Sequence, residues 1–253
     1  MMMKDWIATD LDSTLFTRAW QADDAVAATW NALEDGSRQP SSWMRAATHR
    51  LLAALAHSFA LVPVTARDMD SFARVEVTGL HLRGPAVVAN GAIILGWDGL
   101  PDPEWEAVMT ERLAPWESRL HDFCAWLAEK SRGLARARLV PGPGGLPAYL
   151  VAKATVEWWR TPEARDMIAA MDWLDCRVEV LGSELQVLPP GVGKRGATLE
   201  VQRRWFAGQP PLLCMGDMPL DLEFMRLGGL LATPTGSTLD LSWPASAVSA
   251  VAV

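Results

Sequence analysis

Short apolar runs alternate with longer amphipathic stretches along the first third of the chain. Each run is four to seven residues long and ends in polar or turn-forming residues, which is typical of buried strands. We expect such strands at residues 6–9, 59–65 and 85–89. The stretches between them are expected to be largely helical, so the pattern predicts a parallel sheet that is covered on both faces.

The stretch between the first two runs divides into three parts. Residues 23–35 are predicted to form a helix, because two acidic residues stand near its beginning and a glycine follows its end. Residues 36–42 are polar and rich in turn formers, so we expect a loop there. Ser42 then caps a second helix, whose apolar positions between residues 44 and 55 follow helical spacing. A further short helix is expected from Asp68 onward.

The pattern changes after about residue 92. A long helical stretch over residues 104–131, bent at Pro115, precedes two pairs of strand-like runs. The strand-like runs cover residues 134–140, 146–152, 177–181 and 184–188. A helix opens at Thr161, between the two pairs. This unit of a helix and two strands is used twice, so we expect an inserted α+β domain with an antiparallel sheet.

The alternating pattern then resumes. Its elements are a helix at 196–207, a strand at 212–215, a short helix ending at 227 and a strand at 230–232. The last stretch, residues 233–253, is small and weakly apolar and is expected to pack loosely. The sequence therefore predicts an α/β fold with a doubly wound, Rossmann-like parallel sheet core. Residues 1–91 and 190–253 would form that core, and residues 92–189 an inserted α+β cap domain.

Composition and charge narrow the classes of partner. The chain has 253 residues, of which 50% are hydrophobic and 21% charged, as in a globular protein with a sizeable core. The net charge of −7 argues against nucleic acid as the main partner. A metal ion and a few local cations would still let an acidic protein bind a phosphate ester.

The three cysteines fit no disulfide or zinc pattern, and no apolar run reaches the length of a membrane span. We therefore expect a cytoplasmic protein with no membrane partner.

Two carboxylates stand at the end of the first apolar run. If the strand continues through them, its two-residue period puts Asp10 and Asp12 on one face, where both reach one substrate. Such a pair suits covalent catalysis, with Asp10 as the nucleophile and Asp12 as the acid and base. The alternative is an ordinary acidic turn after a strand. This stretch alone leaves both interpretations open.

Other residues that phosphoryl transfer needs follow further along the chain, near the ends of other expected strands. Thr65 offers a hydroxyl to phosphate oxygens, and Lys194 supplies a cation for the nucleophile and the developing charge. Asp217 and Asp221, four residues apart, are spaced to hold a hard divalent ion. Because ligands bind outside the carboxyl ends of parallel strands, these side chains are expected at one edge of the sheet.

Each piece also has a simpler interpretation. Thr65 alone is a strand-end hydroxyl, Lys194 alone is a solvated lysine in a glycine-rich turn, and the two acids suit a helix start. The segment around Lys194 also imitates a nucleotide-binding P-loop. That imitation fails, since Leu188 occupies the first required glycine and Arg195 the Ser/Thr position. The occurrence of all the pieces in this order favours phosphoryl transfer.

The same residues resemble the motifs of the haloacid dehalogenase-like (HAD) hydrolase superfamily. Residues 10–15 match its first motif, Asp-x-Asp-x-Thr-Leu, and residues 216–221 match its last acidic motif, Gly-Asp-x-x-x-Asp. Thr65 and Lys194 match its threonine and lysine motifs by position, and Ser13 replaces the common glycine of the first motif. The insert resembles the type-II cap of subclass IIB, most similar to that of the sugar-phosphate phosphatases for sucrose phosphate, trehalose phosphate and mannosyl-phosphoglycerate.

This resemblance implies an Mg²⁺-dependent phosphatase that acts on a small phosphorylated metabolite, expected to be a sugar phosphate. The implied metal residues are Asp10, Asp12, Asp217 and Asp221. The candidate substrate-binding residues are Arg67, Asn90, Arg136 and Arg138. For the last two, which share one face of an expected strand in the insert, a solvated surface is the alternative.

Rival functions remain open at this point. One is a phosphomutase or phosphotransferase of the same fold, in which a second sugar receives the phosphoryl group instead of water. Another is a non-catalytic binding protein that keeps the fold. We expect a monomer or a small homo-oligomer.

Overall fold

The computed structural model describes residues 5–18 and 24–242. The chain divides into two compact units, residues 1–100 with 194–253 and residues 101–193. We call the first the core unit and the second the inserted unit, and each is described by itself.

These divisions fall later in the chain than the borders expected near residues 91 and 190. β6 (Ile93–Leu95) pairs antiparallel with β5 (Ala86–Val88), and this pairing keeps β6 in the core unit. At the second border, Lys194 opens the core helix α7 (Lys194–Trp205).

A parallel sheet forms the centre of the core unit, as predicted. Its strands are β1 (Asp5–Thr9), β4 (Phe59–Pro63), β11 (Leu213–Met215) and β12 (Leu230–Ala232), in the order β12-β11-β1-β4. All three pairings are parallel, with Ile7 opposite both Leu61 and Leu213. β5 joins this sheet through a parallel bridge between Val64 and Val87. The carboxyl ends of β1 and β11 therefore lie side by side.

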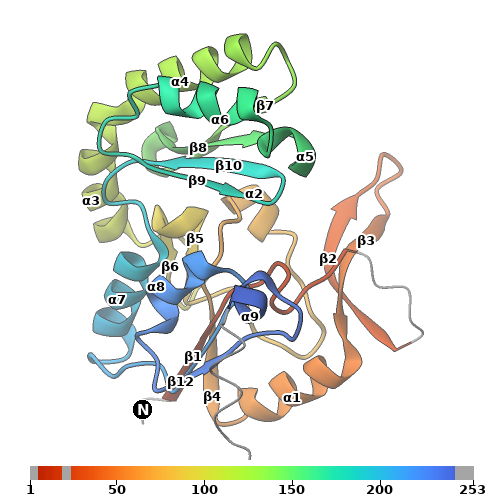
Figure 1. Cartoon of the computed structure of the whole chain (residues 1–253). Helices are drawn as coiled ribbons and strands as arrows, with labels where there is room; N and C mark the ends of the chain where they lie inside the picture. Colours follow the sequence, from red (N-terminus) through yellow and green to blue (C-terminus); the bar gives the residue numbers. More distant parts are fainter. Residues whose placement is uncertain (1–4, 19–23, 243–253) are drawn as a thin grey trace, which may run out of the picture. The chain divides into compact units, whose positions relative to one another are not determined.

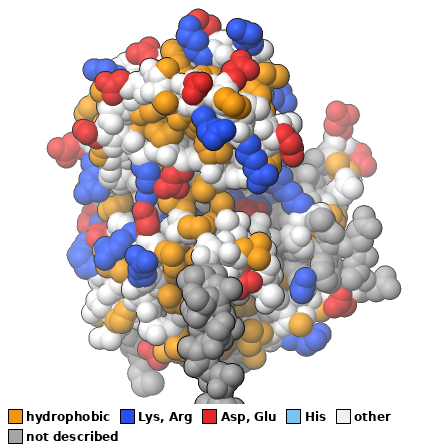
Figure 2. All heavy atoms as spheres, viewed as in Figure 1, with side chains coloured by type: hydrophobic (Ala, Val, Ile, Leu, Met, Phe, Trp, Pro, Cys, Tyr) orange, Lys and Arg blue, Asp and Glu red, His pale blue; other side chains and the backbone are white. Residues whose placement is uncertain are grey.

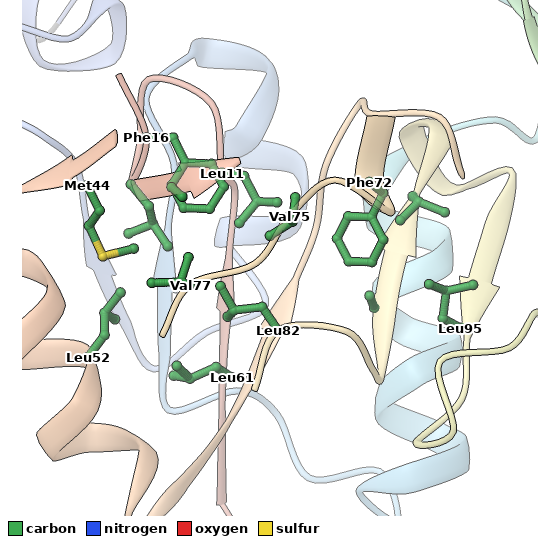
Figure 3. Close-up of a cluster of buried hydrophobic side chains, with 14 of the residues drawn as sticks. Leu11, Phe16, Met44, Leu52, Leu61, Phe72, Val75, Val77, Leu82 and Leu95 are labelled. Carbon is green, nitrogen blue, oxygen red and sulfur yellow. The ribbon is translucent and has the colours of Figure 1, made fainter. Parts of the chain in front are cut away.

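The two faces of β1 are buried against different partners, as alternation along a strand requires. The indole of Trp6 stacks on the ring of Phe206, just past α7, with ring centroids 4.6 Å apart. Its neighbour Ile7 belongs to a hydrophobic cluster on the other face, together with Leu52 of α1 (Ala46–Ala56) and Leu61. Figure 1 shows α7 and α1 on opposite sides of the sheet, and Figure 3 shows this cluster. The doubly wound core is thus confirmed.

The segment after the first motif differs from the prediction. The expected helix at 23–35 and loop at 36–42 are wrong, because β2 (Ala25–Ala32) and β3 (Arg38–Arg45) form an antiparallel hairpin (Figure 1). Ser42 lies within β3, so it does not cap α1, which begins at Ala46 without a side-chain cap. Asp23 lies outside the described residues.

The hairpin forms because both of its strands bury side chains within the core unit. Ala28 and Met44 are fully buried in the cluster that also contains Leu52 and Leu61. The hydroxyl of Thr29, on β2, lies 2.7 Å from that of Ser42 on β3. The glycine that suggested a helix stop instead occupies the tight turn of the hairpin, where Gly36 adopts a φ of 80°.

The remaining helices of the core unit are short. They are α2 (Met69–Phe72), α8 (Leu222–Met225) and α9 (Thr238–Ser242), with 3-10 turns at Ala89–Gly91 and Pro219–Asp221. Asp68 caps α2 by accepting a hydrogen bond from the backbone N–H of Ser71, 2.9 Å away. Of the tail expected to pack loosely, residues 243–253 lie outside the described residues.

The inserted unit contains the predicted antiparallel sheet. Its strands are β7 (Arg136–Pro141), β8 (Pro147–Lys153), β9 (Arg177–Leu181) and β10 (Glu184–Leu188), in the order β7-β8-β10-β9. The long helical stretch is interrupted near Pro115, so that α3 (Pro103–Leu113) and α4 (Glu117–Lys130) flank a 3-10 turn at Ala114–Trp116. A further 3-10 turn at Pro143–Gly145 joins β7 to β8. The last two helices are α5 (Val156–Trp159) and α6 (Pro162–Ala170), the second capped by Thr161 as predicted.

Helices cover one face of this sheet. Leu120 and Phe123 of α4 and Ala164 of α6 form one cluster with residues of β8 and β10 such as Leu150 and Leu185. The inserted unit therefore has its own hydrophobic core. This α+β unit, inserted between two parts of an α/β core, confirms the predicted fold class.

The surface shows no strong charge pattern in the view of Figure 2, where basic and acidic side chains are interspersed on both units. Among the described residues, no helix combines the length and the apolar character needed to cross a membrane.

Truncating Met44 is expected to destabilise the protein far more than truncating Leu33 near the hairpin's turn. Met44 is fully buried, whereas Leu33 is 43% exposed. Met44→Ala removes buried apolar contacts and leaves a cavity, so we expect its free energy of unfolding to fall by roughly 2–5 kcal/mol. Leu33→Ala is expected to change it by less than about 0.5 kcal/mol. Urea unfolding measures both, and equal losses would contradict the assignment of β3 to the core.

Candidate active site

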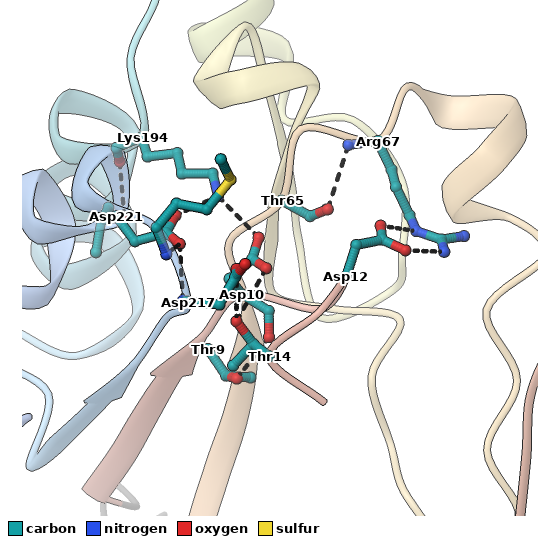
Figure 4. Close-up of polar contacts among 11 residues, drawn as sticks. Thr9, Asp10, Asp12, Thr14, Thr65, Arg67, Lys194, Asp217 and Asp221 are labelled. Carbon is teal, nitrogen blue, oxygen red and sulfur yellow. Dashed lines mark hydrogen bonds and ion pairs between the residues drawn. The ribbon is translucent and has the colours of Figure 1, made fainter. Parts of the chain in front are cut away.

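Three buried carboxylates meet where β1 and β11 end. Asp10 follows β1, and its backbone N–H donates to the carbonyl of Met215 at 2.8 Å, which ties the two strand ends together. Asp217 and Asp221 follow β11 on the next turn. One carboxylate oxygen from each of the three lies within 4.8 Å of the others (Figure 4). The structure thus brings together three of the four predicted metal residues.

Lys194 inserts its ammonium among these carboxylates. Its Nζ donates to Oδ1 of Asp10 at 2.8 Å and to Oδ1 of Asp221 at 2.7 Å. The lysine side chain is only 7% exposed, because it opens α7 and is directed into the site. The predicted lysine therefore contacts the predicted nucleophile directly, although 184 positions separate the two residues in the sequence.

The turn after β11 is shaped to hold Asp221. Its Oδ2 accepts hydrogen bonds from the backbone N–H groups of Asp217 and Met218, both at 3.1 Å. Gly216 allows this close approach, since a Cβ there would come within 2.5 Å of the Cβ of Asp221. This gives a physical reason for the glycine of the last acidic motif.

Thr14 links the carboxylates from the opposite side. Its hydroxyl lies 3.2 Å from Oδ2 of Asp10 and 3.1 Å from Oδ1 of Asp217. Thr14 belongs to the first motif, but no role was predicted for it from the sequence. The motif was an available signal, because its fourth position after the first acid is a hydroxyl residue.

Burial and mutual repulsion shift the pKa values of these acids. Burial, with a further contribution from Asp221, raises the pKa of Asp10 to about 7 even though Lys194 opposes the shift. Burial and the charge of Asp221 raise the pKa of Asp217 to about 6. Burial disfavours the charge on Lys194, but Asp10 and Asp221 together hold its pKa well above the ordinary value. One ammonium thus faces three carboxylates.

This arrangement fits a hard divalent cation. Carboxylate oxygens are the ligands that Mg²⁺ prefers, and the cluster of Asp10, Asp217 and Asp221 offers one from each residue. An added cation would also relieve the repulsion that raises the two pKa values. The chemistry of the donor set therefore matches the predicted ion.

Asp12 lies apart from this cluster. β1 ends at Thr9, and Ser13 adopts a φ of 64°, so the strand alternation assumed for the acidic pair does not continue through Asp12. Its carboxylate forms an ion pair with the guanidinium of Arg67 instead (Figure 4). The structure therefore shows Asp12 beside a cation rather than among the other three acids.

Thr65, Arg67 and Asn90 lie together at the carboxyl end of β4. The Thr65 hydroxyl accepts a hydrogen bond from the backbone N–H of Arg67 at 3.2 Å. The backbone N–H of Asn90 donates to the Thr65 carbonyl at 3.1 Å. Thr65 and Asn90 are both buried, and Asn90 adopts a φ of 51° that asparagine tolerates better than most residues.

The two predicted arginines of the insert lie on one face of β7. Arg136 and Arg138 are both exposed, while Ala137 and Leu139 between and beyond them pack against the hydrophobic cluster of the inserted unit. Arg136 stands opposite Lys153 and Arg138 opposite Val151 on β8. The predicted shared face is confirmed, and their role in binding stays a prediction.

Comparison with known proteins identifies solved structures that share this fold. No protein-family model and no curated protein matches the chain. Solved structures do match. A subclass IIB sugar phosphatase of the HAD superfamily has 13% sequence identity and a TM-score of 0.55, with 94% of this chain and 90% of the other covered.

Two further structures match over similar lengths. A trehalose-6-phosphate phosphatase related protein has 16% identity and a TM-score of 0.54, with 92% of this chain and 88% of the other covered. The sucrose-phosphatase of Synechocystis, solved with sucrose and phosphate, has 16% identity and a TM-score of 0.51, with 94% and 95% covered.

These likenesses concern architecture. The chain has the fold of the HAD phosphatases of subclass IIB, in which a parallel-sheet core carries an inserted α+β domain. The resemblance drawn from the motifs is thereby confirmed at the level of the fold. The buried carboxylates lie where the parallel strands end, which is the expected place for a ligand in an open α/β sheet.

Without metal, the protein is expected to lose stability as the pH rises from about 4 to about 7. The pKa of Asp10, about 7 when folded, lies above the ordinary 3.8, so the folded state holds an extra proton in this range. This contribution is complete below the ordinary pKa and lost as the pH passes the raised one, on the order of 1 kcal/mol per pH unit.

Denaturation in chelator over this pH range measures the effect. Asp10→Asn is expected to flatten the decline, with a remainder from Asp217, whereas Asp122→Asn on the exposed surface of α4 should leave it unchanged. Mg²⁺ should stabilise the wild type most at the higher pH, where Asp10 is ionised. The same decline in Asp10→Asn as in the wild type would contradict the assignment.

Proposed function

We propose that this protein is an Mg²⁺-dependent phosphatase that hydrolyses a small phosphorylated metabolite, a sugar phosphate, through an aspartyl-phosphate intermediate. The observation that carries the proposal is the buried cluster of Asp10, Asp217 and Asp221 around Lys194, at the carboxyl end of the sheet. The fold adds support, because solved phosphatases of subclass IIB share it.

The reaction proceeds in two transfers. A carboxylate oxygen of Asp10 attacks phosphorus while the bond from phosphorus to the leaving oxygen breaks, and Asp12 gives that oxygen a proton. Water then attacks the same phosphorus, its proton passes to Asp12, and the bond from phosphorus to Asp10 breaks. The products are an alcohol and inorganic phosphate, and Asp10 and Asp12 return to their starting states.

The surrounding residues offset negative charge on the reacting groups and hold the phosphoryl group in position. Lys194 already contacts Asp10 at 2.8 Å, so its ammonium offsets charge on the attacking carboxylate and on the phosphoryl oxygens. Thr65, at the next strand end, offers its hydroxyl to a phosphoryl oxygen. Asp10, Asp217 and Asp221 would hold Mg²⁺, which supplies positive charge to the phosphoryl group when bound.

The choice of a sugar phosphate rests on the comparisons and on the inserted unit. Two of the matching structures are a sugar phosphatase and a sucrose-phosphatase. In this chain the inserted unit presents exposed arginines at Arg136 and Arg138, which suit an anionic or hydroxyl-rich ligand. We propose that the inserted unit acts as the cap that selects the substrate.

A screen of phosphate release across sugar, polyol, nucleotide and cofactor phosphates tests this function. The expected result is Mg²⁺-dependent release of inorganic phosphate, strongest with a sugar phosphate. An isomeric sugar phosphate as the product, without free phosphate, would indicate transfer to a second sugar. Full activity after exhaustive chelation would contradict the role of the metal.

Asp10→Asn is expected to lower kcat by several orders of magnitude while the protein stays folded. An amide of the same shape cannot attack phosphorus, so the covalent intermediate does not form. Phosphate release and circular dichroism measure the two effects. Asp122→Asn, at an exposed position of α4, is the control and should keep normal turnover. Near-normal turnover in Asp10→Asn would show that the nucleophile is another group.

Charge reversal at Arg136 or Arg138 is expected to raise KM for the best sugar phosphate by about tenfold or more, equivalent to ~1.4 kcal/mol of binding. The value of kcat should change much less, since the chemical step depends on the core unit. Arg165→Glu, at an exposed position of α6, is the matched control. Unchanged KM and substrate preference in both variants would assign the two arginines to a solvated surface.

A further inference from the structure

Asp12 is held by a two-point contact with Arg67. The Nε of Arg67 donates to Oδ2 of Asp12 at 2.7 Å, and its Nη2 donates to Oδ1 at 2.6 Å. Two parallel hydrogen bonds between planar groups fix the rotation of the carboxylate as well as its distance, which a single contact does not.

The arginine is the anchored member of this pair. Its Nη1 donates to the carbonyl of Ser71 at 3.1 Å, and its guanidinium lies over the ring of Phe16, 5.8 Å from the centroid. The side chain of Arg67 is 12% exposed, whereas that of Asp12 is 44% exposed. The guanidinium is therefore enclosed by protein, and the carboxylate is the partner that solvent or a ligand can reach.

Neighbouring backbone contacts hold both residues of this ion pair in place. Ser71 belongs to α2, whose first turn is capped by Asp68. Phe16 is fully buried, and its backbone N–H donates to the carbonyl of Leu11 at 2.8 Å, which closes the turn that carries Asp12. Arg67 thus ties the turn after β1 to the helix after β4 (Figure 4).

We propose that Arg67 is a positioning residue that directs the carboxyl group of Asp12 toward the leaving oxygen. This inference rests on the proposed function and goes beyond it, because it gives Arg67 a role through Asp12 in place of direct contact with the substrate. The two hydrogen bonds from Arg67 use one lone pair on each oxygen of Asp12. The remaining lone pairs stay available to carry the transferred proton.

The need of the leaving group for a proton distinguishes this positioning role from direct binding of the phosphate. When the bond from phosphorus to an alkyl oxygen breaks, that oxygen needs the proton of Asp12, because an alkoxide is a poor leaving group. A p-nitrophenolate leaves as a stable anion and needs no proton. Benzyl phosphate and p-nitrophenyl phosphate are similar in size, so they differ chiefly in this requirement.

The experiment compares kcat/KM for these two esters in the wild type, Arg67→Gln and Arg67→Lys. We expect Arg67→Gln to lose roughly ten- to hundredfold with benzyl phosphate and less than about threefold with p-nitrophenyl phosphate. Arg67→Lys keeps the charge without the two-point contact, so it should show the same selective loss to a smaller extent. The inhibition constant of inorganic phosphate should stay within about threefold, because it reports phosphate binding.

A double-mutant cycle tests whether Arg67 acts through Asp12. Asp12→Asn alone should also lose activity selectively with benzyl phosphate, and adding Arg67→Gln to it should cost little more. The matched control is Arg38→Gln, which removes an arginine–carboxylate contact of 2.9 Å with Glu76 on the exposed surface. It should leave the ratio of the two substrates unchanged.

The outcomes are distinct. Equal losses with both esters, together with a weaker inhibition by phosphate, would overturn the inference and make Arg67 a phosphate-binding residue. A wild type that is inactive toward both esters and toward the screened metabolites would instead overturn the proposed function. If Arg67→Gln fails to fold by circular dichroism, the substrate ratio of Arg67→Lys decides the matter in the same way.

Discussion

The ion pairs of Lys194 with Asp10 and Asp221 are the contacts on which the site depends. Taking several carboxylates out of water is costly, and a nearby cation offsets only part of that cost. Here one ammonium bonds to two carboxylates, and two backbone N–H groups donate to the second oxygen of Asp221. The third acid, Asp217, accepts a hydrogen bond from the hydroxyl of Thr14. The site is therefore organised around an incomplete charge balance, which a divalent cation is suited to complete.

Much of the core and of this cluster could be predicted because the signals are local. Each short apolar run forms a strand, and the polar residue that follows it lies at the same edge of a parallel sheet. Asp10 and Asp217 were placed together by this rule alone, even though they belong to opposite ends of the chain. The strands Arg177–Leu181 and Glu184–Leu188 were predicted at their observed bounds, since the glycine between them marks the turn.

The hairpin of β2 and β3 could not be predicted by the same local reasoning. Alanines at Ala25, Ala27 and Ala28 favour a helix by intrinsic preference, and the acidic residues nearby suit a helix start. The strand is instead stabilised by its partner. Ala28 is buried with Met44, and the hydroxyls of Thr29 and Ser42 meet across the pair. Such cross-strand contacts lie outside any short window of sequence, so tertiary packing overrides the local preference.

The separation of Asp12 from Asp10 follows from where β1 ends. Two-residue alternation would hold both carboxylates on one face, but the strand stops at Thr9 and the chain turns, with Leu11 fully buried between the two acids. The two carboxylates consequently lie in different surroundings, one enclosed with an ammonium and the other half exposed against a guanidinium. Covalent phosphoryl transfer needs one carboxylate to stay bonded to phosphorus while another exchanges protons with alcohol and water. Under the proposed function, burial suits the first task and access to solvent suits the second, so the end of the strand gives the two acids the different surroundings that these tasks need.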